Sequence, residues 1–244
     1  MIVDAHCTIG FGRHFQFSAR ELVQQMDQAG INRAVVGPVD EHITVYNREG
    51  NLFIREAVDS YPDRLVGFAT ANPWYGAPAV NELRRAFDDG LRGLTLNTAL
   101  QGYFIHDELV HPLIQVAAEY KAPVYFHTAT PIFALPFQLA ELARCFPQVN
   151  FIMGHLGAAD FWTDVVPAAS QSPNIYLETS IRSGVATIWN AVKGVGAERV
   201  LFGSSAPESE PDIELAKMRL VGLSPDEESL VLGVNMLRLL GEVP

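Results

Sequence analysis

The segments PVYFH (123–127) and NFIMGH (150–155) are short apolar runs that each end in a histidine. Continuously apolar runs of this length are typical of strands that are covered on both faces, as in a parallel sheet. Their final histidines are 155 − 127 = 28 residues apart, which leaves room for a helix between the two strands. The pair therefore predicts a strand-helix-strand unit with a histidine at the end of each strand.

Six further runs of the same kind extend this pattern along the chain, at 2–6, 33–37, 65–72, 93–97, 174–180 and 199–204. Consecutive runs end between 204 − 180 = 24 and 72 − 37 = 35 residues apart, a spacing that fits repeated units of strand and helix. Eight such α/β units favour a closed (β/α)8 TIM barrel, which commonly takes about 250 residues. We therefore expect a single TIM-barrel domain over residues 1–244.

The alternative closure is an open, doubly wound sheet that binds a dinucleotide. Its phosphate-binding turn follows the first strand and carries the motif Gly-x-Gly-x-x-Gly. Here the corresponding turn begins Gly10-Phe11-Gly12-Arg13 and lacks the third glycine at the required spacing. This turn favours the barrel.

The expected helices between the runs have recognisable ends. Ser18 and Glu21 form a capping box ahead of an apolar helical pattern that stops at Gly30. The last helix begins in the same way, with Ser224 as the cap and Glu227 as its partner. These signals support the alternation of strands and helices.

Charge and composition exclude several classes of partner. The chain has 17 Lys and Arg against 28 Asp and Glu, a net charge of −11 that repels polyphosphates and argues against a nucleic-acid partner. No signal-like segment follows Met1, and no apolar run approaches the roughly 18 residues of a membrane span. Two cysteines are too few for a disulfide framework. We therefore expect a cytoplasmic protein that is not bound to a membrane.

Three of the seven histidines stand at the ends of predicted strands: His6, His127 and His155. In a TIM barrel, the reacting groups project from the carboxyl ends of the strands. A single histidine there is more often a buried, hydrogen-bonded core residue. Three converging imidazoles could instead hold one zinc ion or a neighbouring transition metal. Both alternatives stay open at this point.

Several of these segments together resemble the amidohydrolase superfamily, and within it the amidohydrolase-related group of metal-dependent TIM-barrel hydrolases and decarboxylases. The similar segments are VDAHCTIG (3–10), LTLN (94–97), PVYFHT (123–128), FIMGHLG (151–157), YLETS (176–180) and LFGSSAP (201–207). The resemblance implies a divalent metal ion, most plausibly zinc, on His6, His127 and His155. It also implies a small-molecule substrate and a possible homo-oligomer.

Two positions depart from the pattern of that family. Thr8 stands where the family has a second histidine, and Ser205 stands where it has an aspartate that contacts the metal and accepts a proton from water. We therefore single out Glu178 as a substitute base or ligand, and Ser205 as a catalytic group that hydrogen-bonds substrate or water. The alternative for Glu178 is a structural hydrogen bond near the rim of the barrel.

Other polar residues near the expected working face could bind substrate. Arg13 and His14 follow the first strand, Asn97 ends the fourth and Arg182 follows the seventh. Arginine binds a carboxylate through two parallel hydrogen bonds, so these residues could orient an acidic substrate. The alternative for each loop arginine is a solvated surface charge.

Three hypotheses for function follow. The first is a metal-dependent hydrolase that acts on a small carboxylate, amide, ester or lactone. The second is a metal-free, degenerate barrel with lactonase-like chemistry or ligand binding alone, which the substitutions at Thr8 and Ser205 motivate. The third is a non-oxidative decarboxylase, an activity that the resemblance also includes.

Overall fold

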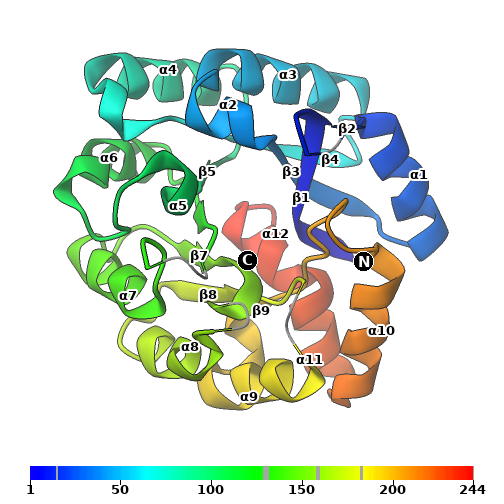
Figure 1. Ribbon diagram of the computed structural model, residues 1–244. Helices are drawn as coiled ribbons and strands as arrows, with labels where there is room; N and C mark the ends of the chain where they lie inside the picture. Colours follow the sequence, from blue (N-terminus) through cyan, green and yellow to red (C-terminus); the bar gives the residue numbers. More distant parts are fainter. Residues whose placement is uncertain (15, 129–131, 158–159, 182–183, 244) are drawn as a thin grey trace.

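The computed structural model describes residues 1–14, 16–128, 132–157, 160–181 and 184–243. Its main feature is a curled parallel sheet wrapped by helices (Figure 1). In the described part of the chain the parallel strands are β1 (Val3–Phe11), β3 (Arg33–Pro38), β4 (Leu65–Ala69), β5 (Gly93–Leu96), β6 (Val124–Phe126), β7 (Phe151–Met153), β8 (Ile175–Glu178) and β9 (Val200–Leu201).

Hydrogen bonds between the first strand and the segment after the last strand close the sheet. The strands follow one another in the order β1-β3-β4-β5-β6-β7-β8-β9, so β1 and β9 lie at its two ends. The N–H of Ala5 donates to the carbonyl of Phe202 at 2.9 Å, and the N–H of Ser205 donates to the carbonyl of His6 at 2.8 Å. The chain therefore forms the predicted TIM barrel.

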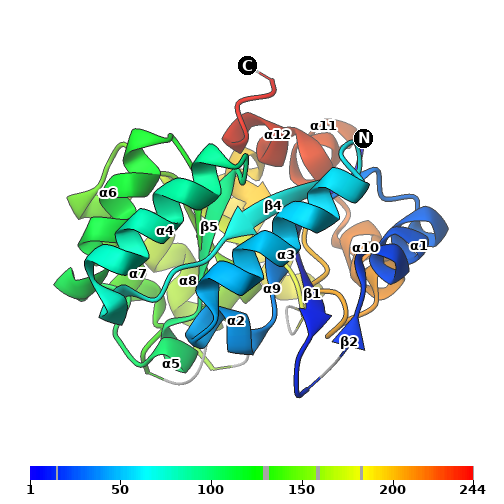
Figure 2. The same ribbon diagram turned by 90° about the horizontal axis from the view of Figure 1, so that it is seen from above.

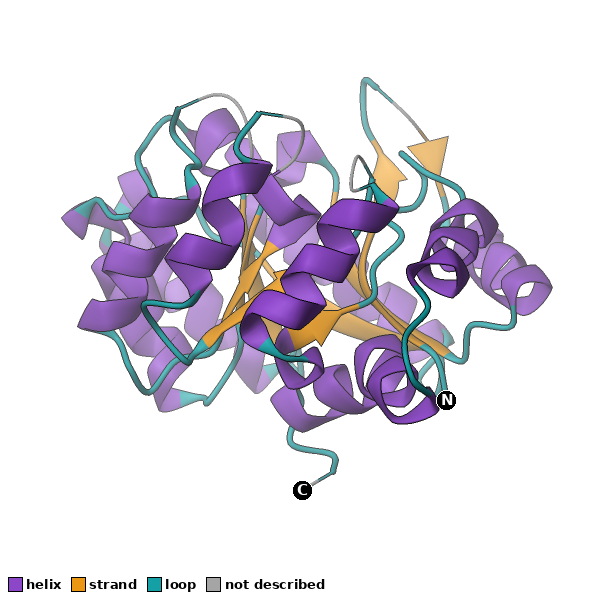
Figure 3. Ribbon diagram, turned by 90° about the horizontal axis from the view of Figure 1, so that it is seen from below, coloured by secondary structure: helices purple, strands orange, loops and turns teal. Residues whose placement is uncertain are grey.

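Helices surround the sheet, which Figure 3 shows enclosed between them. The α-helices are α1 (Ala19–Ala29), α2 (Asp40–Thr44), α3 (Asn47–Ser60), α4 (Ala77–Asp88), α5 (Thr98–Gln101), α6 (His111–Glu119), α7 (Pro136–Cys145), α8 (Trp162–Ala169), α9 (Val185–Val195), α10 (Pro211–Val221), α11 (Pro225–Ser229) and α12 (Asn235–Leu239). Short 3-10 turns are η1 (Pro73–Tyr75), η2 (Glu108–Val110), η3 (Gly154–Gly157) and η4 (Ala197–Arg199), and a π-helical turn, η5 (Leu230–Val234), joins α11 to α12. Both predicted capping boxes are present, at Ser18 and at Ser224.

Among the residues that the structure describes, two hydrophobic clusters hold the layers together. The larger lies between the strands and the surrounding helices, and the smaller fills the inside of the barrel. Side chains of α12, among them Met236 and Leu239, join the inner cluster together with Val35 and Phe68. Helix α12 therefore plugs the end of the barrel at which the strands begin.

The two ends of the barrel are formed by different segments of the chain. Figure 2 shows both chain termini with α11 and α12 at one end, and α5 and the tip of β1 at the other. The strands run toward the second end, so the loops after them gather there. Among the described residues, no helix is both long enough and apolar enough to span a bilayer.

Several strands differ from the sequence predictions, and the first, predicted for residues 2–6, continues to Phe11. The run at 65–72 ends as a strand at Ala69, because the side chain of Asn72 accepts a hydrogen bond from the N–H of Trp74 and caps η1. The run at 199–204 pairs only over Val200–Leu201, since the following backbone bonds to β1 instead. A short strand that was not predicted, β2 (Gln16–Phe17), pairs antiparallel with the end of β1.

Candidate metal centre

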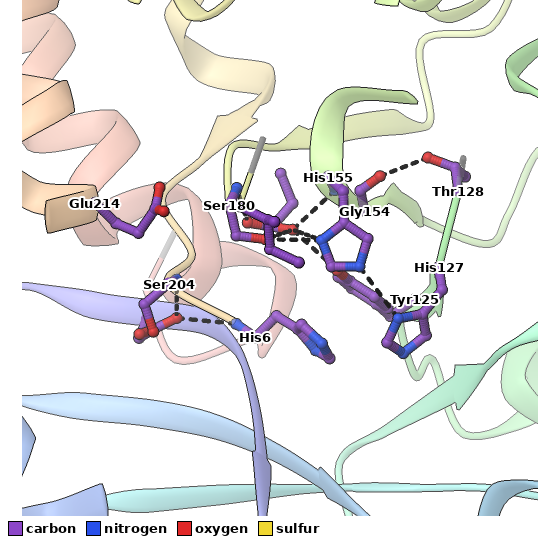
Figure 4. Close-up of polar contacts among 12 residues, drawn as sticks. His6, Tyr125, His127, Thr128, Gly154, His155, Ser180, Ser204 and Glu214 are labelled. Atoms are coloured by element: carbon purple, nitrogen blue, oxygen red, sulfur yellow. Dashed lines mark hydrogen bonds and ion pairs between the residues drawn. The ribbon is translucent and has the colours of Figure 1, made fainter. Parts of the chain in front are cut away.

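The structure brings His6, His127 and His155 together at the end of the barrel where the strands finish. His6 lies in β1, His127 directly follows β6, and His155 lies in η3 directly after β7. One ring nitrogen from each histidine lies within 4.8 Å of the others (Figure 4). The convergence expected from the sequence is therefore present.

The His6 ring meets the other two rings edge to face, and the rings of His127 and His155 are tilted by 45° to one another. The centroid of the His6 ring lies 4.8 Å from that of His127 and 5.5 Å from that of His155. Nδ1 of His127 lies 3.1 Å from Nε2 of His155, the shortest of these approaches. Tyr125 packs beneath this group, with its ring stacked on His6 at 4.3 Å between centroids. The stacking fixes the plane of the His6 ring.

The site supplies neutral imidazoles. Burial lowers the pKa of His6 well below its usual value, and nearby His127 and His155 lower it further. Burial likewise lowers the pKa of His127, and it lowers the pKa of His155 to about 4. All three rings are therefore uncharged near neutral pH, which is the form that binds metal ions.

One ring nitrogen is unsatisfied. Nε2 of His6 is buried and has no hydrogen-bond partner among the described residues. A buried polar atom without a partner carries a free-energy cost of about 1–3 kcal/mol, and a bound cation removes that cost. The unpartnered nitrogen, the neutral rings and their close approach fit a divalent ion.

A buried carboxylate, that of Glu178, accepts hydrogen bonds from several residues of the site. Glu178, at the end of β8, has no exposed surface. Its Oε2 accepts hydrogen bonds from Tyr125 Oη at 2.9 Å, the His155 N–H at 3.0 Å and Ser180 Oγ at 2.9 Å. Its Oε1 accepts the N–H of Ser180 at 2.6 Å. These contacts correspond to the structural alternative for Glu178, and the role of base or metal ligand stays a prediction.

The backbone at His155 adopts an uncommon conformation. His155 has φ 62° and Leu156 has φ 45°, both in the left-handed region that residues other than glycine rarely occupy. Such outliers persist where the surroundings hold them, and they cluster at functional sites. Here the Glu178 carboxylate binds the N–H of His155, which helps to hold the turn.

A second buried carboxylate joins β1 to the loop after β9. Asp4 Oδ1 accepts the N–H of His6 at 3.1 Å and the N–H of Ser204 at 2.9 Å. Burial raises the pKa of Asp4 to about 6. The next residue, Ser205, is buried with φ 58°, and its N–H bonds to the backbone of His6. The loop that carries Ser205 therefore runs beside His6.

The register of β1 shifts between Asp4 and Cys7, where β1 has one more residue than β3. A β-bulge of this kind redirects the side chains that follow it. The side of the sheet that Asp4 faces therefore cannot be inferred from the side that His6 faces by counting alternate residues along β1.

Two of the predicted substrate-binding residues are exposed, and a third caps a helix. Arg13 and His14 are exposed after β1, where the N–H of Arg13 donates to Glu41 Oε1 at 2.8 Å. Asn97 caps α5 by accepting the N–H of Leu100 at 3.2 Å. Arg182 falls outside the described residues. Substrate binding by these four residues stays a prediction.

Sequence reasoning missed two residues of the site, Tyr125 and Ser180. Tyr125 lies two positions before His127 and so faces the same side of its strand, a signal that was available in the run PVYFH. Ser180 was visible only as a polar residue at a strand end. Its contact with His155 Nδ1 at 2.8 Å depends on the fold.

Comparisons with known proteins agree with this geometry. The family model described as Amidohydrolase matches residues 4–241, so the chain belongs to the amidohydrolase family. No curated protein matches the sequence.

Among solved structures, the chain is similar to 5-carboxyvanillate decarboxylase from Sphingomonas paucimobilis, at 16% identity and a TM-score of 0.79 over 98% of each chain. It is also similar to a dihydroxybenzoic acid decarboxylase from a Polaromonas species that was solved with manganese, at 16% identity and a TM-score of 0.79, over 98% of this chain and 96% of that one. A probable 2-pyrone-4,6-dicarboxylic acid hydrolase from Acinetobacter baumannii has 16% identity and a TM-score of 0.75, over 98% of this chain and 99% of that one. At these identities the likeness shows the fold.

Proposed function

We propose that this protein is a metal-dependent hydrolase that acts on a small ester, amide or lactone bearing a carboxylate. His6, His127 and His155 would hold one divalent ion. The observation that carries the proposal is the convergence of three neutral imidazoles, of which His6 leaves a buried Nε2 without a partner among the described residues. Zinc is the favoured ion because it binds nitrogen donors in sites with three protein ligands.

The ion would supply Lewis acidity to a substrate oxygen. Three neutral rings would give the ion no charged ligand and Ser205 in place of the family aspartate adds none, while the carboxylates of Asp4 and Glu178 bond to the backbone N–H groups of His6 and His155. We therefore expect the substrate group that binds at the ion to be anionic. Arg13 and His14, on the same end of the barrel, are candidates to bind a substrate carboxylate, and Ser205 is a candidate to hydrogen-bond the reacting group.

A second candidate function is non-oxidative decarboxylation of an aromatic carboxylate. It is favoured by the likeness to two decarboxylases, one of which was solved with manganese. The same three histidines would hold the ion, and manganese would then be a suitable metal. The substrate would again be anionic, so the two functions differ in the bond that breaks rather than in the charge that is recognised.

Elemental analysis and a substrate panel test both functions. Protein purified without added metal is expected to carry zinc, and it is then assayed with lactones, carboxylated amides and hydroxylated benzoates. Hydrolysis that stops on chelation and returns with zinc supports the first function. Release of carbon dioxide from the benzoates supports the second. Absence of bound metal at every level of supplementation contradicts both and favours a metal-free barrel.

A further inference from the structure

Glu178 is the end point of a directed chain of hydrogen bonds that starts at the histidine cluster. Two of the donors to its carboxylate are the backbone N–H groups of His155 and Ser180, at 3.0 and 2.6 Å. A backbone N–H can only donate, so the carboxylate serves as the acceptor in both bonds. Glu178, at the end of β8, therefore acts as the acceptor, and the neighbouring hydroxyl groups donate to it.

The hydroxyl of Ser180 transmits this direction to His155. Ser180 Oγ donates its single proton to Glu178 Oε2 at 2.9 Å. The same oxygen lies 2.8 Å from Nδ1 of His155, and it can only accept there because its proton is already used. Nδ1 of His155 therefore carries the ring proton, and Nε2 carries the lone pair.

That lone pair points into the histidine cluster. Nε2 of His155 lies 3.1 Å from Nδ1 of His127 and 3.4 Å from Tyr125 Oη. Without a cation, the proton in the first contact belongs to His127. A cation that displaces this proton finds the Nε2 lone pair already oriented.

We propose that Glu178 is a positioning residue that acts through Ser180 to hold His155 in its Nδ1–H tautomer, with Nε2 free to bind a cation. The inference rests on the proposed metal site and gives Glu178 a role other than base or ligand. The same carboxylate binds the N–H of His155, whose backbone is left-handed, so it positions the residue at two points. Partners of this kind typically contribute 10–100-fold to metal affinity.

Ser180→Ala removes the acceptor for Nδ1 and tests the chain most directly. Nδ1 lies 3.7 Å from the nearest Glu178 oxygen, beyond the range of a good hydrogen bond. We expect His155 to change to the Nε2–H tautomer and to donate to His127. Ring-15N NMR of the metal-free protein reports this change, and titration with zinc is expected to show an affinity about 10–100-fold lower.

Ser180→Thr, Glu178→Leu and Tyr125→Phe complete the series. Ser180→Thr keeps the hydroxyl and is expected to keep the wild-type tautomer. Glu178→Leu frees the Ser180 hydroxyl to donate to His155, so both tautomers are expected. Tyr125→Phe removes one donor to Glu178 without breaking the chain, and the tautomer is expected to stay the same. These comparisons separate a loss of hydrogen bonding from a general loss of packing.

The outcomes distinguish this inference from the proposed function. A wild-type protein that binds no zinc, but whose His155 tautomer changes in Ser180→Ala, contradicts the metal site and supports the positioning chain. A wild-type protein that binds zinc with His155 in the Nε2–H form overturns the chain and leaves the metal site standing. An unchanged tautomer and affinity in Ser180→Ala also overturn it.

Discussion

Nδ1 of His127 lies 3.1 Å from Nε2 of His155, although the two residues are 28 positions apart. Two ring nitrogens at this distance either share a proton or direct two lone pairs at one point. Burial lowers the pKa of both rings, so neither gains a second proton near neutral pH. In the proposed metal site, a bound ion would take the place of this shared proton.

Removing one of these rings is expected to abolish stabilisation by zinc. Zinc at about 100 times its Kd stabilises a folded protein by about 2.7 kcal/mol, which for a chain of this size raises Tm by roughly 5–10 °C. We expect this shift in the wild-type protein and none in His127→Ala. Differential scanning calorimetry with zinc and with a chelator measures it. His106→Ala, whose ring packs near Phe104, is the control and should keep the full shift.

Restoring a carboxylate after β9 is expected to tighten cation binding. Ser205→Asp places an acidic group where the amidohydrolase family has one, and aspartate tolerates the left-handed backbone at φ 58° better than most residues. We expect about a tenfold increase in zinc affinity, or about 1.4 kcal/mol. Isothermal titration calorimetry compares it with Ser205→Asn, which has the same shape without the charge. Equal affinities for the two variants would argue against Ser205 facing the ion.

A methyl group at Gly154 is expected to disturb the site through packing. Its Cβ would collide with the ring and hydroxyl of Tyr125 and approach the carbonyl of Phe126 at 2.9 Å. We expect Gly154→Ala to lower the free energy of unfolding by about 1–3 kcal/mol and to weaken zinc binding at the adjacent His155. Urea unfolding measures the first effect. Gly184→Ala, whose Cβ would meet Thr187 alone among the described residues, at 4.0 Å, should change stability by less than about 0.5 kcal/mol.

Stability in acid is expected to depend on Glu227, in the first turn of α11. Lys193 Nζ donates to its carboxylate at 2.7 Å and the N–H of Ser224 donates at 2.9 Å; these bonds, that of Lys193 first, lower its pKa to about 2 from the usual 4.5. A lowered folded-state pKa stabilises the protein above pH 4.5, and the contribution is lost as the pH falls toward about 2.

Glu227→Gln should therefore be less stable than the wild type near neutral pH, with a difference that shrinks as the pH falls below 4.5. Urea unfolding over a series of pH values measures the difference. Asp226→Asn removes one carboxylate from the same first turn of α11 and is the matched control for the loss of charge. A difference for Glu227→Gln that is constant with pH would contradict the prediction.

The sequence by itself determined the order of strands and helices and the placing of His127 and His155 just after the ends of two strands, whereas His6 lies within β1, which continues to Phe11. It could do so because apolar runs, helix caps and strand-end positions are local features, read within about ten residues. The TIM barrel then brings the carboxyl ends of the strands together, independently of which side chains contact one another there.

Only the tertiary structure decided which atoms meet there. Tyr125 and Glu178 are 53 residues apart, and His155 and Ser180 are 25 apart, so no local pattern reports their hydrogen bonds. The left-handed turn at His155 and the register shift in β1 also depend on neighbouring strands. Two of the four donors to the Glu178 carboxylate come from Ser180, only two residues along the chain, whereas the donors from Tyr125 and His155 reach it only because the strands pack side by side.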